Sequence, residues 1–192
     1  MSATATPSSL ASDGDVSVII ASLGLAPHPE GGFYARVFTS DLTSVAAQGL
    51  RPAITSIYYL CRAGEKSSLH ELRSDELWFW HAGDALEVVE LSNTTNGNDT
   101  NAAVATVTRT RIGPAIGSGL VAAPIRFSHG VRAGITFGAA CVLGGTFGYT
   151  LVSCAVAPGF DFSDWKMEKA EILNARFRGL DAAAAIAQLA SR

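Results

Sequence analysis

The stretch GEKSSLHELRSDELWFWHAG, Gly64–Gly83, decides the fold of this 192-residue chain. A histidine, His70, and a glutamate, Glu76, stand six positions apart between its two terminal glycines. Alternate residues of a strand point to the same side, so His70 shares a face with Leu72, and Glu76 shares a face with Trp78. The pattern predicts two successive strands, each with one chemically active side chain on the same face as an apolar one.

This spacing resembles the first sequence motif of the cupin superfamily, with Leu72 where a second histidine is usual. Four further strings resemble the DUF985 branch, also called cupin type 5: HPEGGFYARVF (28–38), SIYYL (56–60), DELW (75–78) and VAPGFDF (156–162). The resemblance implies an all-β fold, a double-stranded β-helix or cupin jelly-roll barrel with short N-terminal and C-terminal helices. It also implies that the two motif faces turn toward the barrel interior.

Length and composition are typical of one compact domain. We expect residues 1–14 to form a disordered tail and residues 15–192 a single cupin domain. Within it, a short helix is expected from Asp15 or Ser17 to Gly24, and an alanine-rich helix over 180–190 that packs outside the barrel or across a dimer seam. Hydrophobic residues make up 48% of the chain and charged residues 16%, a balance that favours a homodimer.

The charge pattern argues against nucleic acid as a partner, because the formal net charge is −3 and no cluster of lysine or arginine is present. The amino terminus lacks the pattern of a secretory signal, and no apolar stretch has the length of a membrane helix. We therefore expect a cytoplasmic protein that does not enter membranes. Its three cysteines are odd in number and far apart, which favours buried reduced thiols over a disulfide framework.

A degenerate second cupin motif keeps Pro124 and His129 but has Arg126 in place of the usual glycine. The resemblance implies that His129 joins His70 and Glu76 as a set of metal ligands. Two imidazoles and one carboxylate suit one divalent ion, Fe, Mn, Ni or Zn, and leave positions open for substrate. The alternative is a pocket without metal, in which the three groups bind a polar ligand or one another.

The segment HPEGGFYAR is the second candidate cluster. Its glycines permit a tight turn before a strand in which Tyr34 and Arg36 point the same way. The guanidinium of Arg36 suits a carboxylate or phosphate, and the phenol of Tyr34 can donate or accept a proton. An equally weighted alternative is a structural ion pair between Glu30 and Arg36.

Hydroxyl and indole groups on neighbouring strands complete the expected pocket. Ser56 and Tyr58 have the same strand parity, and Trp78 stands next to the motif glutamate; each can also be an ordinary core residue. His81 has the opposite parity from Glu76 and is expected to face outward. His28 precedes a proline in a loop and is ranked below His70, so neither His28 nor His81 is predicted to be catalytic.

The sequence predicts a small-molecule enzyme that performs isomerase, epimerase or lyase chemistry on a carbohydrate-like or carbonyl substrate. Such reactions need two groups of unlike protonation state, one to remove a proton and one to return it. A metal-assisted oxygenase or decarboxylase is a subsidiary form, and the alternative is a non-catalytic cupin that binds or senses a small ligand. The predicted catalytic residues are His70, Glu76 and Tyr34; the predicted substrate-binding residues are Glu30, Arg36, Ser56, Tyr58, Trp78 and His129.

Overall fold

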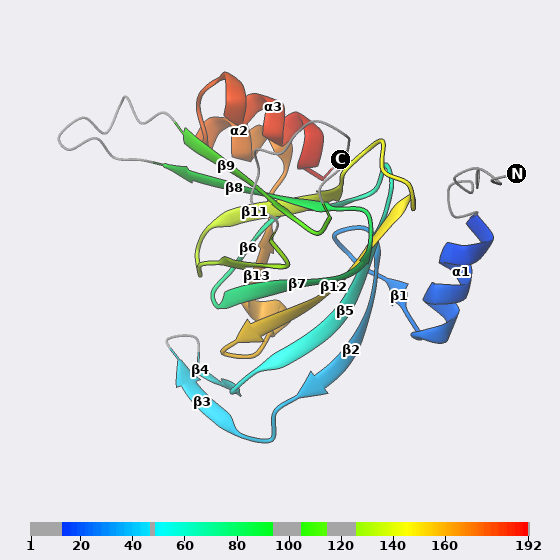
Figure 1. The fold of residues 1–192 in the computed structure, drawn as a ribbon. Coiled ribbons are helices and arrows are strands. Elements are labelled where there is room, and N and C mark those ends of the chain that lie inside the picture. The colour runs from blue at the N-terminus through cyan, green and yellow to red at the C-terminus, as the bar shows by residue number, and fades with distance from the viewer. Residues whose placement is uncertain (1–12, 47–48, 94–104, 115–125, 192) are drawn as a thin grey trace, which may run out of the picture.

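The computed structural model describes residues 13–46, 49–93, 105–114 and 126–191, and Figure 1 shows two main sheets with helices on their outer sides. All pairings between the named strands are antiparallel. The six-stranded sheet has the order β1 (Ala26–Pro27), β2 (Phe33–Thr39), β5 (Thr55–Arg62), β12 (Tyr149–Ala157), β7 (Asp75–Gly83) and β10 (Ser128–Val131). The five-stranded sheet has the order β13 (Trp165–Met167), β6 (Lys66–Leu72), β11 (Thr136–Cys141), β8 (Leu86–Asn93) and β9 (Ala105–Ile112). A hairpin of β3 (Thr43–Ala46) and β4 (Gly49–Pro52) stands apart from both sheets.

The burial of each strand follows from what covers its two faces. In β12, buried and half-buried residues alternate, as expected of a strand with one face on the core. In β8 both faces carry apolar side chains, because Val88 faces the other sheet while Val89 and Leu91 face the helices. A strand covered on both sides loses its regular alternation, as the adjacent buried residues Val88 and Val89 show.

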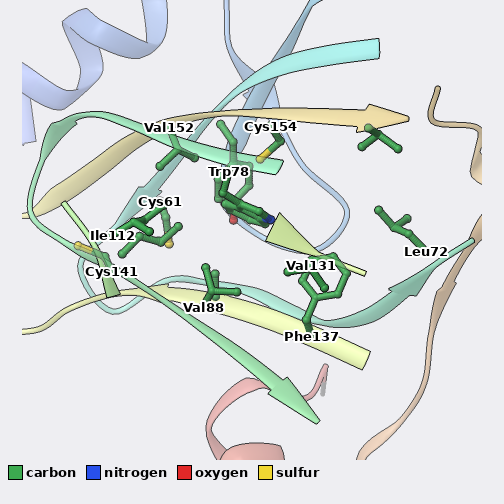
Figure 2. Close-up of a cluster of buried hydrophobic side chains, with 14 residues drawn as sticks. Cys61, Leu72, Trp78, Val88, Ile112, Val131, Phe137, Cys141, Val152 and Cys154 are labelled. Carbon is green, nitrogen blue, oxygen red and sulfur yellow. The ribbon is translucent and has the colours of Figure 1, made fainter. Parts of the chain in front are cut away.

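The main core lies between the two sheets. Figure 2 shows side chains from both sheets meeting there, among them Trp78, Val88, Phe137 and Val152. Cys61, Cys141 and Cys154 belong to the buried residues of the chain and all three are free thiols, as the sequence predicted. Burial of such large apolar side chains stabilises the barrel by about 1.5–3 kcal/mol for each one that is fully covered.

The helices pack on the outside of the barrel. Helix α1 (Asp13–Ser22) covers the outer face of the six-stranded sheet, while α2 (Ala170–Arg176) and α3 (Leu180–Leu189) cover the five-stranded sheet (Figure 1). A short 3-10 helix, η1 (Phe162–Asp164), precedes β13. The first helix begins before the predicted Asp15, and α2 was not predicted. Residues 1–12, most of the expected tail, lie outside the described residues.

The predicted all-β jelly-roll with short terminal helices is confirmed. None of the helices in the described part of the chain has the length and apolar character needed to cross a membrane.

Candidate functional site

A pocket of about 60 Å³ lies inside the barrel between β2, β5, β6, β7 and β12, a volume that holds several water-sized groups. The segment after β12 closes one side of it. We call this space the barrel pocket. Its lining residues are His28, Glu30, Tyr34, Arg36, Thr55, Ser56, Ile57, Tyr59, His70, Leu72, Glu76, Trp78, Cys154, Val156, Phe160 and Phe162.

A tight turn over residues 28–32 brings two polar side chains into the pocket. The N–H of His28 donates to the carbonyl of Gly32 (2.9 Å), and the N–H of Gly31 donates to the carbonyl of His28 (3.0 Å). Gly31 has φ +107°, a conformation that disfavours other residues, and a Cβ added there would overlap the carbonyl oxygen of Lys66. The turn can therefore lie against β6 only with glycine at position 31, and this contact places Glu30 in the lining of the pocket.

The carboxylate of Glu30 is buried and held by three groups. Its Oε2 accepts a hydrogen bond from the Ser67 hydroxyl (2.6 Å), and its Oε1 accepts one from the indole N–H of Trp165 (2.6 Å). Nδ1 of His70 lies 3.3 Å from Oε2. Ser67 and His70 are three positions apart, but a register shift in the pairing of β6 with β11 lets both face the same carboxylate.

The contacts of His70 determine which ring nitrogen carries the proton. Nδ1 lies 2.8 Å from the backbone carbonyl of Ser68, and a carbonyl can only accept. The proton of the neutral ring is therefore on Nδ1, and Nε2 keeps its lone pair. The His70 side chain is only 3% exposed, and its Nε2 has no hydrogen-bond partner among the described residues. His70 thus presents a base to the pocket.

Glu76 presents an acid to the same pocket. Its side chain is buried, and its Oε2 is one of two buried side-chain atoms in the described residues that have no hydrogen-bond partner. Burial, together with the negative charge of Glu30, raises the pKa of Glu76 to about 8. The carboxyl group therefore holds its proton at neutral pH. Cys154 lines the pocket beside this carboxyl group. Burial raises the pKa of Cys154 well above its ordinary value, so it stays a thiol.

Tyr34 and Arg36 lie side by side in the lining of the pocket, both from β2. The guanidinium carbon of Arg36 lies 5.8 Å from the centre of the Phe160 ring, an arrangement that holds a cation over an aromatic face. Within the described residues, Arg36 has no carboxylate partner. The alternative ion pair with Glu30 is not formed, because Ser67, Trp165 and His70 occupy the Glu30 carboxylate.

Three further predicted substrate-binding residues have different positions. Trp78 is buried in the pocket wall with its indole N–H unpartnered. Ser56 also lines the pocket, and its hydroxyl donates to the carbonyl of Cys154 (2.9 Å). Tyr58 does not line it: its side chain packs on the outer face of the sheet against buried residues that include Val16 of α1. Tyr59, one residue later, has the inward parity. The expectation for Tyr58 is therefore corrected to Tyr59.

His129 lies away from the other two predicted metal ligands. It is on β10, at the edge of the six-stranded sheet, and its Nε2 lies 2.7 Å from Oε1 of Glu90 on β8. It does not line the barrel pocket. In the described part of the chain, no three His, Cys, Asp or Glu side chains are arranged to hold a metal ion. The residues therefore do not assemble the predicted three-ligand set. His129 meets Glu90 of β8, and β11 lies between β8 and β6, the strand that carries His70.

Sequence reasoning missed several members of the pocket. His28 was ranked low because it stands in a loop, but the glycine turn that follows it brings it into the lining. Tyr59 donates its hydroxyl proton to the carbonyl of Gly31 (2.9 Å) and so supports that turn. Cys154 was predicted to be buried but not to contact Glu76. His81 is exposed, as its parity predicted, and lies 2.8 Å from the hydroxyl of Ser153.

A model of the family described as the cupin superfamily (DUF985) matches residues 17–168 of the chain. The chain belongs to this cupin family. The cupin is also similar to a hypothetical protein from Leishmania major, with 32% identity, a TM-score of 0.76, and coverage of 92% of this chain and 98% of that one. A protein from Shewanella oneidensis is similar at 31% identity and a TM-score of 0.73, over 91% of this chain and 96% of that one. No curated protein matches this cupin significantly.

Proposed function

We propose that this cupin is a small-molecule enzyme of the isomerase, epimerase or lyase type. It moves a proton on a carbonyl or carbohydrate-like substrate inside the barrel pocket. The observation that carries the proposal is the pairing of His70 with Glu76: a basic Nε2 and a protonated carboxyl group in the lining of one pocket. Two groups of unlike protonation state are what a stepwise proton transfer requires.

The roles follow from the contacts. Nε2 of His70 takes a proton from the carbon next to the substrate carbonyl. The electron pair of that C–H bond forms a carbon–carbon double bond, and the π electron pair of the carbonyl moves to its oxygen. Glu76 gives its proton back to carbon, and exchange with water then restores both groups. The Glu30 carboxylate, whose Oε2 lies 3.3 Å from Nδ1 of His70, favours the imidazolium that forms, since a nearby negative charge stabilises it.

Arg36, an exposed side chain in the pocket lining, favours a substrate that carries an anionic group. Arg36 has no carboxylate partner in the described residues and its guanidinium matches a carboxylate or phosphate in shape and charge. Tyr34, beside it, offers a hydroxyl to the same group or to the reacting oxygen. We therefore place the anionic end of the substrate at Arg36 and its carbonyl between His70 and Glu76.

Solvent exchange tests this function whatever the product of the reaction is. The protein is incubated in D2O with a panel of 2-keto acids and of aldose and ketose phosphates, and loss of C–H signals is followed by proton NMR. We expect deuterium to enter one of them. Glu76→Gln and His70→Gln should each slow the exchange by about 100-fold or more, with the fold intact by circular dichroism.

The control is His81→Gln on the outer face, which should exchange at the rate of the unaltered protein. Exchange at that same rate by Glu76→Gln would contradict the assigned roles. Tight binding of a panel compound with no exchange at any pH would favour a binding or sensing cupin instead.

A further inference from the structure

His28 and His70 line the same pocket, and their backbone contacts favour opposite tautomers of the two neutral rings. The backbone N–H of Glu30 donates to Nδ1 of His28 (3.2 Å), so this nitrogen must carry a lone pair. The neutral ring then has its proton on Nε2. In His70 the carbonyl of Ser68 requires the reverse arrangement, with the proton on Nδ1.

The surroundings of His28 keep its ring neutral. Burial lowers the pKa of His28 below its ordinary value of 6.5, and His70 lowers it further, although the charge of Glu30 acts in the opposite direction. Oε2 of Glu30 is 3.9 Å from Nδ1 of His28, too far for a hydrogen bond. The imidazole also meets the ring of Tyr34 edge to face, with 4.5 Å between centroids, which restricts its orientation.

Nε2–H of His28 is available to a ligand. It has no hydrogen-bond partner among the described residues, and it is not one of their buried unpartnered atoms, so it remains accessible. His28 belongs to the pocket lining together with His70 and Glu76. An accessible, neutral N–H in a pocket that also holds a base is suited to stabilising an oxyanion, because the donor is positioned before charge develops.

We propose that His28 is a catalytic residue whose neutral Nε2–H donates a hydrogen bond to the substrate oxygen that becomes negative during proton transfer. The inference rests on the proposed function and extends it: the substrate passes through an enolate or enediolate. The two histidines then differ in role, since His70 accepts the proton from carbon while His28 binds the oxygen that receives the electron pair.

The first test is direct and needs no substrate. Long-range proton–nitrogen NMR spectra of the 15N-labelled full chain at pH 7 report which nitrogen of each histidine is protonated. The chain has four histidines, and single His→Gln variants assign them. We expect a protonated Nε2 with a bare Nδ1 for His28, and the reverse for His70. A protonated Nδ1 on His28, or a doubly protonated ring, would overturn the proposal.

The second test uses oxalate, a planar dianion that resembles an enediolate. We expect oxalate to shift the Nε2 proton of His28 downfield, and His28→Ala to weaken oxalate binding by at least about tenfold in calorimetry. His28→Gln places an amide N–H near the original Nε2 and should recover part of the affinity. His81→Gln is the matched control and should bind oxalate normally.

The outcomes separate this inference from the proposed function. If oxalate bound and Arg36→Met weakened it, while His28→Ala and His28→Gln folded and bound as the unaltered protein does, the role of His28 alone would be overturned. If the unaltered protein bound no oxalate, the anion site of the proposed function would fail, and the inference with it.

Discussion

Glu76 is the residue whose chemistry depends most on burial. In water this carboxyl group would be ionised at neutral pH. Inside the barrel its charged form loses solvation and is repelled by the charge of Glu30, and both effects raise its pKa. Among the described residues, Oε2 of this group has no hydrogen-bond partner. An unpartnered buried oxygen costs stability, which is typical of a group kept for function.

This burial predicts a pH dependence of stability. The pKa of Glu76 rises from its ordinary 4.5 to about 8, so between these values the folded state holds a proton that the unfolded state has lost. The free energy of unfolding should therefore fall as pH rises through this window, by up to about 1.4 kcal/mol per pH unit from this group. Glu76→Gln should flatten the slope in urea unfolding between pH 5 and 8.

A surface acid provides the control for that experiment. Glu171 is exposed in α2, and Glu171→Gln should keep the slope of the unaltered protein. Equal slopes for the unaltered protein and for Glu76→Gln would show that the buried group does not hold its proton.

At the scale of elements, the turn over residues 28–32 positions both Glu30 and His28. It lies against β6, where the N–H of Ser68 donates to the carbonyl of Glu30 (2.9 Å), and Tyr59 from β5 donates to the carbonyl of Gly31. The position of this turn is therefore defined by hydrogen bonds from its backbone carbonyls to two strands of the barrel.

Gly31→Ala tests this turn. Alanine at a positive φ costs about 1–2 kcal/mol, and overlap with the Lys66 carbonyl should add about 1–3 kcal/mol. Gly64→Ala is the matched control, because Gly64 also has a positive φ (+84°) but open space around its Cβ position. Urea unfolding should show the larger loss for Gly31→Ala; equal losses would mean that the turn moves away from β6 easily.

At the scale of the whole molecule, the pair of His129 and Glu90 joins the two sheets, from the edge strand β10 of one to the inner strand β8 of the other. The side chains are 15% and 18% exposed and 2.7 Å apart. We expect a coupling free energy of about 1 kcal/mol from a double-mutant cycle of His129→Ala and Glu90→Ala in urea unfolding at pH 6. A coupling near zero would show that the contact adds nothing to the closure of the barrel at this edge.

Strand alternation made part of the site predictable. The parity of β7 placed Glu76 and Trp78 on one face and His81 on the other, because a regular strand turns successive side chains to opposite faces. The resemblance to cupins indicated that the Glu76 face turns inward. In β5 the same reasoning chose the wrong tyrosine. Both faces of that strand are covered, one by the core and one by α1, so the pattern of apolar residues does not indicate which face is inward.

The resemblance of several separated strings to cupins predicted the jelly-roll barrel, and two-residue periodicity predicted the strand that carries Glu76, because both signals are local features of the sequence. Only the tertiary structure decided that Glu30 and His28 join His70, since a glycine turn and a register shift in the pairing of β6 with β11 bring these groups together. It likewise paired His129, on the edge strand β10, with Glu90 of the other sheet. Strand order and the groups that surround a buried polar side chain depend on contacts between segments far apart in the chain. Local sequence patterns do not encode such contacts.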